Sequence, residues 1–148
     1  FNYRLTDVQA SLGISQLKKL DMFIKKREGI AKTYDKAFEK VDINPLYTFN
    51  GKSSYHLYVA QINFDKYSFS KKDLFIDMKE QNIGLQVHYI PINKQPYYTN
   101  LGYGNEHTPE MDNYYKQSFS IPIFPSLKDR EQKHVINELL KYTSEHKI

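Results

Sequence analysis

Asn2, Arg4 and Thr6 stand together at the start of a long helical pattern, and their side chains are of types that bind anions. The hydroxyl of Thr6 can cap the helix by accepting a backbone N–H of its first turn. A helix start also carries unpaired N–H groups and a partial positive charge, and Arg4 and Asn2 add donors that suit phosphate. Because no glycine-rich phosphate loop accompanies them, an ordinary capped helix start is the simpler interpretation.

A second group of polar residues lies on predicted strands. His88 and Tyr89 end one such strand just before a long loop, where binding groups are common, and His56 begins another. A single histidine on a strand is more often structural than chemical. The sequence pairs no nucleophile with a base and places no histidines at the spacing of a zinc site. Residue types alone therefore indicate a binding or packing domain, with no catalytic residue and no metal.

Composition narrows the class of protein. The 148 residues carry 21 basic and 17 acidic side chains, and the lysines are dispersed, which is typical of a solvated surface. No nucleic-acid-binding motif, membrane-spanning run or signal peptide is recognisable. The absence of cysteine excludes disulfides and fits a reducing compartment. We therefore expect a cytoplasmic protein without nucleic-acid or membrane partners. Because the first residue is Phe1 rather than Met, we also expect a piece of a longer protein.

Helical periodicity dominates the first part of the chain. From Thr6 to about Val41, apolar residues recur every three or four positions, which predicts a helical region with one buried stripe. A joint is expected near Leu20, where Asp21 would cap a second segment. The stripe consists of Val8, Leu12, Leu17, Leu20, Ile24, Ile30, Ala31, Tyr34, Phe38 and Val41.

Three later helices are predicted from their start signals. Ser70 and Asp73 form a capping box for one, and Pro109 opens a second that runs to about Ser118. Ser126 is expected to cap the last helix. The residues expected to face inward are Leu74, Phe75 and Met78 in the first of these helices and Val135, Ile136, Leu139 and Leu140 in the last.

Extended segments separate these helices. Branched and aromatic residues predict strands over 55–63 and 85–90 and an edge segment over 121–125, and residues 91–109 are expected to form a long polar loop. The order of helices and strands indicates an α+β fold, in which helices pack on one face of a short, mainly antiparallel sheet. We expect one domain over residues 1–148.

Four ordered stretches closely resemble segments of the DegT/DnrJ/EryC1/StrS family of sugar-nucleotide aminotransferases. They are NYRLTDVQASLG (2–13) with QLKKLD (16–21), Arg27 and Tyr34; SYHLY (54–58); VHYIPI (87–92); and SIPIFP (120–125). Together they cover nearly the whole chain. Within the family, the first and third stretches are most similar to the transaminases of the pseudaminic acid pathway, which aminate C4 of a UDP-4-keto-6-deoxy-hexosamine.

This resemblance implies a fold, a cofactor and a reaction. Family members are homodimeric fold-type I enzymes that use pyridoxal phosphate, and their cofactor lysine lies in a larger N-terminal domain. No lysine of this chain stands in a similar segment, so residues 1–148 resemble the small C-terminal domain with the large domain missing, inactive alone. The full-length enzyme is expected to transfer an amino group from glutamate to a 4-keto-6-deoxy UDP-sugar, for cell-surface or flagellar glycans.

The resemblance also implies roles for individual residues. Asn2 matches an asparagine that reaches the cofactor phosphate of the other subunit, and Arg4 matches an arginine near the substrate pocket. His88 and Tyr89 match a His-Tyr pair near the nucleotide-sugar site. His56 matches a strand histidine, which we take as a further substrate-binding residue.

One position departs from the family pattern. Family members often carry a second histidine two residues after the proline of His-Tyr-x-Pro, and this chain has Asn93 there, which leaves the local sugar contact open. The alternative function is a non-catalytic binding, regulatory or dimerisation domain of the same fold. An aminotransferase domain should expose apolar residues on its first helix and tyrosine-rich loop, where the missing domain would cover them, whereas an independent interaction module should not.

Overall fold

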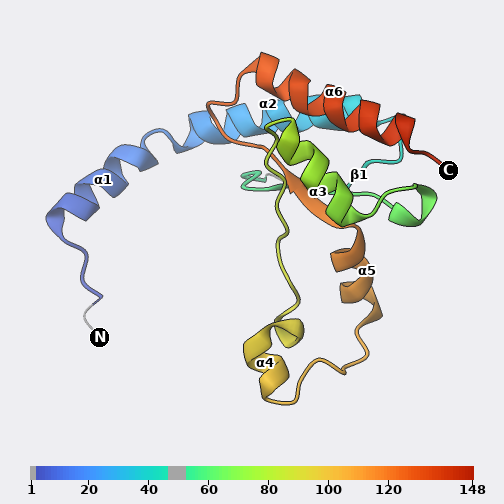
Figure 1. The fold of residues 1–148 in the computed structure, drawn as a ribbon. Coiled ribbons are helices and arrows are strands. Elements are labelled where there is room, and N and C mark those ends of the chain that lie inside the picture. The colour runs from blue at the N-terminus through green and yellow to red at the C-terminus, as the bar shows by residue number, and fades with distance from the viewer. Residues whose placement is uncertain (1–2, 47–52) are drawn as a thin grey trace.

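The computed structural model describes residues 3–46 and 53–148 (Figure 1). The helices in these residues are α1 (Asp7–Leu17), α2 (Leu20–Phe38), α3 (Lys71–Glu80), α4 (Pro96–Asn100), α5 (Pro109–Gln117) and α6 (Asp129–Glu145). The strands are β1 (Asn44–Pro45), β2 (Tyr58–Gln61) and β3 (Ser118–Ile121), and two 3-10 turns are η1 (Phe64–Lys66) and η2 (Ile92–Lys94). None of these described helices has both the length and the hydropathy that crossing a membrane requires.

Two helix starts are fixed by the side chains that the sequence predicts. Before α1, the Thr6 hydroxyl accepts a hydrogen bond from Gln9 N–H at 3.3 Å, and the Gln9 side chain accepts one from Thr6 N–H at 2.9 Å. Before α3, the Ser70 hydroxyl accepts one from Asp73 N–H at 3.2 Å, and the Asp73 carboxylate accepts one from Ser70 N–H at 2.9 Å. Each capping box satisfies donors that a first helical turn leaves unpaired.

The three strands form one antiparallel sheet in the order β1, β2, β3. Tyr58 of β2 pairs with Ile121, and Ala60 pairs with Phe119. Tyr58, Ala60 and Ile62 are buried, so the alternate side chains of this strand form a buried face. The strand is shorter than expected, and β3 begins earlier than the predicted edge segment. The antiparallel sheet with helices packed on it confirms the α+β fold class.

The core forms where α6 and the second half of α2 pack together over the sheet (Figure 1). The Gln132 side-chain amide donates to the Ile30 carbonyl at 2.8 Å inside this contact, and the Tyr34 hydroxyl donates to the Pro122 carbonyl at 2.8 Å. Both bonds satisfy buried polar groups while joining α2 to α6 and to the chain after β3. The core residues that α2 and α6 contribute are Ile30, Ala31, Tyr34, Phe38, Val135, Ile136 and Leu139, and α3 adds Leu74 and Met78.

In contrast, α1 extends away from this core and buries none of its residues (Figure 1). Val8, Leu12 and Leu17 are 80%, 61% and 67% exposed. The predicted buried stripe is therefore wrong for α1, although it is correct for the second half of α2. The reason is that periodicity identifies an apolar helix face but not whether the same chain covers it.

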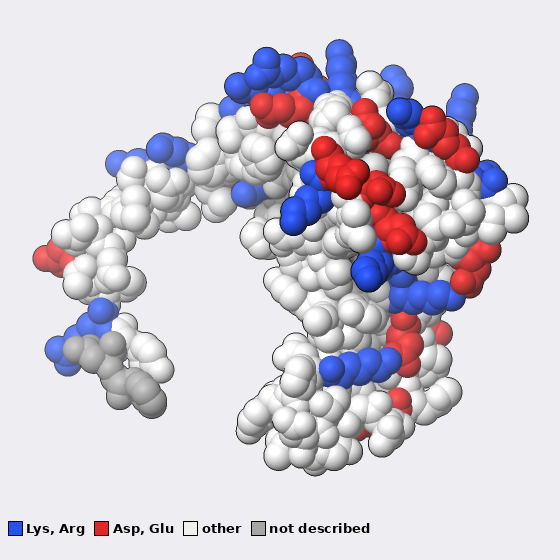
Figure 2. Space-filling view, in the orientation of Figure 1, with Lys and Arg blue, Asp and Glu red and all other residues white. Residues whose placement is uncertain are grey.

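A tyrosine-rich segment around α4 forms a second projection, which we call the α4 lobe (residues 91–108). It exposes Tyr97, Leu101 and Tyr103, and the hollow between α1 and the lobe is mostly uncharged in Figure 2. The sequence analysis expects a loop here, and this prediction is wrong in that η2 and α4 both form. The Pro at the first position of α4 suits a helix start, since its missing N–H would be unpaired there anyway.

Hydrogen bonds to one carboxylate join the two ends of the lobe. The Asn93 amide and the Gly104 N–H both donate to Glu106 at 2.8 Å. These bonds, with that of Asn93 the largest cause, lower the pKa of the Glu106 carboxyl. Gly104 has a φ of +111°, and a Cβ there would lie 3.3 Å from the Asn93 carbonyl. Asn93 therefore holds the lobe closed at a point where the backbone itself is tightly packed.

Residues 85–90 do not form the predicted strand. Gln86 exchanges two backbone hydrogen bonds with Ser120, at 3.1 and 2.7 Å, as an isolated bridge. Beyond this bridge, the His88 carbonyl accepts a hydrogen bond from the Tyr114 hydroxyl at 2.8 Å. A side chain thus satisfies a group that a neighbouring strand would otherwise pair, and the ladder does not continue.

Two predicted caps are also wrong. The Glu131 carboxylate accepts the N–H of Lys128 at 3.0 Å, so α6 begins after Lys128 and Ser126 stays in the preceding turn. Asp21 does not cap α2, because the helix already includes Leu20. Lys128 and Glu131 therefore define the start of α6, and α2 begins at Leu20 without a side-chain cap.

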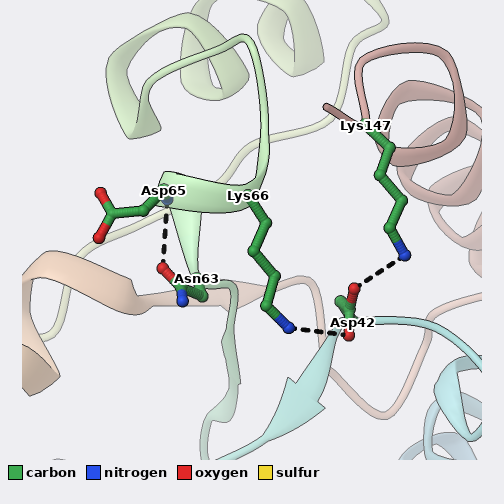
Figure 3. A network of polar contacts seen from close by, with 5 residues as sticks. All are labelled: Asp42, Asn63, Asp65, Lys66 and Lys147. Atoms are coloured by element: carbon green, nitrogen blue, oxygen red, sulfur yellow. Dashed lines mark hydrogen bonds and ion pairs between the residues drawn. The ribbon is translucent and has the colours of Figure 1, made fainter.

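Ion pairs attach the end of the chain to the body (Figure 3). Asp42 pairs with Lys147 at 3.0 Å and with Lys66 at 3.5 Å. The hydrogen bond from Lys147 is the largest cause of a lowered pKa at Asp42. Nearby, the Asn63 side chain accepts the N–H of Asp65 at 3.2 Å and starts η1. These partly exposed pairs join the residues after α6 to the loop after α2 and to η1, with little energy each.

Candidate functional site

A cavity of about 970 Å³ opens beside the start of α6, the end of β3 and the segment that follows α3. Its volume is that of a small-molecule site, for which about 300–1,000 Å³ is usual. The apolar wall consists of Leu57, Ile83, Ile121, Pro122, Ile123, Phe124, Leu127 and Val135. The polar lining consists of His56, Asn82, Gln86, His88, Ser120, Arg130, Glu131 and His134. An apolar wall with a few convergent polar groups is typical of a ligand site.

His88 is held in this cavity by two elements at once. Its Nδ1 lies 2.8 Å from the Oγ of Ser120, which is only 5% exposed on β3. Its carbonyl accepts the hydroxyl of Tyr114 on α5. The ring also meets Tyr89 edge to face, with centroids 4.7 Å apart. Because Ser120 occupies Nδ1, the other ring nitrogen, Nε2, is left to bind a ligand as donor or acceptor.

His56 lines the same cavity from the approach to β2. It is exposed, and the sequence analysis places it inside the strand, whereas β2 begins at Tyr58. The structure thus places His56 and His88 in the lining of one cavity although they are far apart in the sequence. A substrate-binding role for the two histidines remains a prediction.

The remaining predicted site residues lie elsewhere. Tyr89 is 69% exposed and is not among the cavity residues. Arg4 is exposed in the segment before α1, and α1 points away from α6 and β3 (Figure 1). Asn2 lies outside the described residues. This chain alone therefore does not gather all its predicted site residues into one site.

Several cavity residues are missed by the sequence analysis. Ser120 and Tyr114 position His88, and no local pattern signals either role. Arg130 and His134 line the cavity from successive turns of α6. The His134 Nε2 lies 2.9 Å from the Gln81 carbonyl, which fixes that ring against the end of α3. The spacing of Arg130 and His134, four residues apart on one helix, is the signal that could have placed them on the same face.

The cavity contains no amine nucleophile among the described residues. No lysine lines it, and the partly buried Lys71 donates instead to the Tyr115 carbonyl at 2.6 Å. Desolvation lowers the pKa of Lys71, but this residue starts α3 and is not a cavity residue. Within residues 3–46 and 53–148, no group of three or more acidic, histidine or cysteine side chains could hold a metal ion.

A protein-family model, described as the DegT/DnrJ/EryC1/StrS aminotransferase family, matches residues 1–140. The chain belongs to this family. Among curated family relatives, a UDP-4-amino-4,6-dideoxy-N-acetyl-beta-L-altrosamine transaminase of Campylobacter jejuni is 40% identical over 144 residues. That match covers 94% of this chain and 37% of the relative. The spore coat polysaccharide biosynthesis protein SpsC of Bacillus subtilis is 37% identical over 140 residues, covering 92% of this chain and 36% of SpsC.

Solved structures of the family have the same fold. Helicobacter pylori PseC, an aminotransferase involved in the biosynthesis of pseudoaminic acid, matches with a TM-score of 0.87 and 31% identity, covering 95% of this chain and 38% of PseC. The PLP-form of the putative sugar aminotransferase Spr1654 of Streptococcus pneumoniae matches with a TM-score of 0.87 and 25% identity. The match covers 96% of this chain and 36% of Spr1654. The chain thus spans well under half the length of these family members.

Proposed function

We propose that this chain is the C-terminal domain of a pyridoxal-phosphate-dependent aminotransferase that acts on a nucleotide sugar. The substrate is a 4-keto-6-deoxy UDP-hexosamine, the amino donor is glutamate, and the product is used in cell-surface or flagellar glycans. The whole protein works in the cytoplasm, and the chain alone does not transfer amino groups. Family membership and the activity named for the Campylobacter jejuni relative support the substrate class.

The observation that carries the proposal is the cavity that both His56 and His88 line. Both histidines belong to stretches that resemble the family, and the Ser120 and Tyr114 hydrogen bonds orient His88 before any ligand arrives. A fixed imidazole can bind a sugar hydroxyl or a phosphate oxygen without losing side-chain freedom on binding. We assign His88 and His56 to substrate binding, with Arg4 and Tyr89 joining them in the complete enzyme.

The cofactor needs a group that the described cavity lacks. Pyridoxal phosphate supplies the electron sink for amino transfer and is held by a lysine amine. No lysine lines the cavity, so these residues alone do not fit a covalently held cofactor. We assign that lysine to a preceding, larger domain. The contribution of this chain is Asn2, which contacts the cofactor phosphate of the other subunit in a homodimer. In the whole protein, Asn2→Ala should weaken cofactor retention, and unchanged retention in an intact dimer would remove this role.

The exposed apolar residues support the proposal that a further domain and a second subunit contact this chain. Leu12 on α1 and Tyr97 on the α4 lobe are 61% and 69% exposed, and the hollow between their segments is mostly uncharged (Figure 2). Large exposed apolar surfaces usually mark protein contacts. Exposed apolar residues on both α1 and the α4 lobe are expected of an aminotransferase domain and not of an independent interaction module.

The cofactor assignment is tested with the whole protein that contains this chain, purified with pyridoxal phosphate. We expect a visible absorption band that borohydride removes and that glutamate changes, because the cofactor is bound to a lysine and accepts the amino group. The 148-residue chain alone is the control and should show no such band. No band in the whole protein would instead favour a regulatory or dimerisation domain of the same fold.

A further inference from the structure

The mouth of the cavity carries positive charge that this chain does not neutralise. Arg130 lines the cavity and makes no hydrogen bond or ion pair within residues 3–46 and 53–148. Arg130 is also exposed. An exposed guanidinium that lines a cavity and has no partner among the described residues can donate to a ligand anion.

The acidic side chain in the cavity lining is already engaged. Glu131 is the carboxylate among the described lining residues, and its Oε2 accepts the N–H of Lys128 at 3.0 Å. That bond holds the carboxylate at the start of α6. His134, one turn after Arg130, is likewise engaged by the Gln81 carbonyl and lies 3.8 Å from Glu138. Arg130, His56 and the Nε2 of His88 remain as cavity groups that can donate to a ligand anion.

The wall beside Arg130 is apolar and partly open. Phe124 is 42% exposed and lines the same cavity, next to Ile123 and Leu127. An exposed ring beside a cationic group suits a ligand that has a flat ring at one end and an anionic group at the other. A volume of about 970 Å³ leaves space for both parts of such a ligand.

We infer that Arg130 binds the diphosphate of the nucleotide sugar, with His56 as a second donor and Phe124 against the base. The inference rests on the proposed function and adds Arg130 and Phe124, to which neither the sequence nor the family resemblance gives a role. A guanidinium can donate two parallel hydrogen bonds to phosphate oxygens, which an ammonium cannot do in a fixed geometry. Arg130 is thus a binding residue for the nucleotide end, while His88 lies deeper, against β3.

The test compares Arg130→Gln with Lys133→Gln in the whole protein. Lys133 is exposed on the same helix and is not a cavity residue, so it controls for the loss of one positive charge. Arg130→Gln should raise the KM for the nucleotide sugar by about 10- to 100-fold with kcat within about twofold, the size expected for charged hydrogen bonds. The KM for the amino donor should stay unchanged. Arg130→Lys should recover only part of the loss.

Equilibrium dialysis with UDP separates this inference from the proposed function. Wild type and Lys133→Gln should bind UDP alike, with an affinity that falls as salt rises, and Arg130→Gln should bind more weakly with a smaller salt dependence. Equal UDP binding by Arg130→Gln, or a loss confined to kcat, would overturn the inference. If wild type bound UDP through Arg130 but aminated no keto sugar, the proposed function would fail while the diphosphate site remained.

Discussion

The Nδ1 of His88 and the Oγ of Ser120 lie 2.8 Å apart, between the segment after α3 and a buried position of β3. This contact joins the predicted strand 85–90 to a residue that immediately precedes the predicted edge segment 121–125. It sets the direction of the imidazole, because Ser120 sits on a strand that is itself buried. The orientation of His88 therefore depends on the core of the domain and not on the loop that follows it.

Ser120→Ala should loosen the His88 ring while leaving the fold intact. Loss of one neutral hydrogen bond costs about 1 kcal/mol, which corresponds to about a fivefold higher KM for the nucleotide sugar in the whole protein. Steady-state kinetics gives the measurement. Ser144→Ala, on an exposed turn of α6, is the control. An unchanged KM in Ser120→Ala would show that the hydrogen bond does not position His88 for binding.

Tyr114→Phe should destabilise the segment that carries His88. The Tyr114 hydroxyl donates to the His88 carbonyl at 2.8 Å, and its loss leaves that carbonyl without this donor. We expect a decrease of about 1 kcal/mol in the free energy of unfolding, measured by denaturant titration. Tyr115→Phe is a matched control, because the Lys71 ammonium lies over its ring, which the change keeps. Equal stability of both variants would contradict the assignment.

The core between α2, α6 and the sheet should respond strongly to a smaller side chain. Leu139 is fully buried, so Leu139→Ala should lower the free energy of unfolding by about 2–5 kcal/mol. Thermal and denaturant unfolding provide the measurement. A change below about 0.5 kcal/mol, the usual range for surface positions, would mean that α6 does not pack as described.

Substitution on the exposed apolar face of α1, unlike substitution in the core, should have little effect on the free energy of unfolding. Leu12 is 61% exposed, so Leu12→Asp should leave the stability of the 148-residue chain nearly unchanged. In the whole protein the same change should weaken assembly, because a charge would be placed in the contact that covers α1. Sedimentation of the whole protein measures this, with Lys19→Asp, an exposed position next to the joint with α2, as the control. A stable dimer with Leu12→Asp would contradict a role for α1 in assembly.

The α4 lobe should open in acid. Hydrogen bonds from Asn93 and Gly104 lower the pKa of Glu106 in the folded state below its unfolded value. The carboxylate therefore stabilises the lobe above the unfolded pKa of about 4.3, and this contribution is lost as pH falls through the lower, folded pKa. Exchange of the Gly104 N–H, corrected for intrinsic rates, should speed up in that acid range. Glu106→Gln should exchange faster already at neutral pH, whereas Glu110→Gln should match wild type.

Hydrogen bonds between residues that are close in the sequence are predicted well. Ser70 and Asp73 form the capping box that the sequence predicts, because donor and acceptor are three residues apart. Thr6 caps α1 as predicted, and Gln9 completes a capping box there that the sequence analysis does not name.

Long-range partners account for the errors. The composition of residues 85–90 favours a strand, but pairing depends on Ser120 and Tyr114, which are distant in sequence. The apolar stripe through Leu12 is exposed on α1, because periodicity identifies an apolar helix face but not what covers it. The spacing of Arg130 and His134 could place them on one helix face, but it could not show that His56 and His88 line the same cavity.

The most direct test of the central proposal follows the nitrogen itself. The whole protein, loaded with pyridoxal phosphate, is incubated with glutamate that carries isotope-labelled nitrogen and with a 4-keto-6-deoxy UDP-hexosamine. We predict labelled nitrogen on C4 of the sugar and an equal amount of 2-oxoglutarate, and neither product with the 148-residue chain alone. A cofactor-loaded whole protein that labels no such sugar would contradict the assignment of this domain to a nucleotide-sugar aminotransferase.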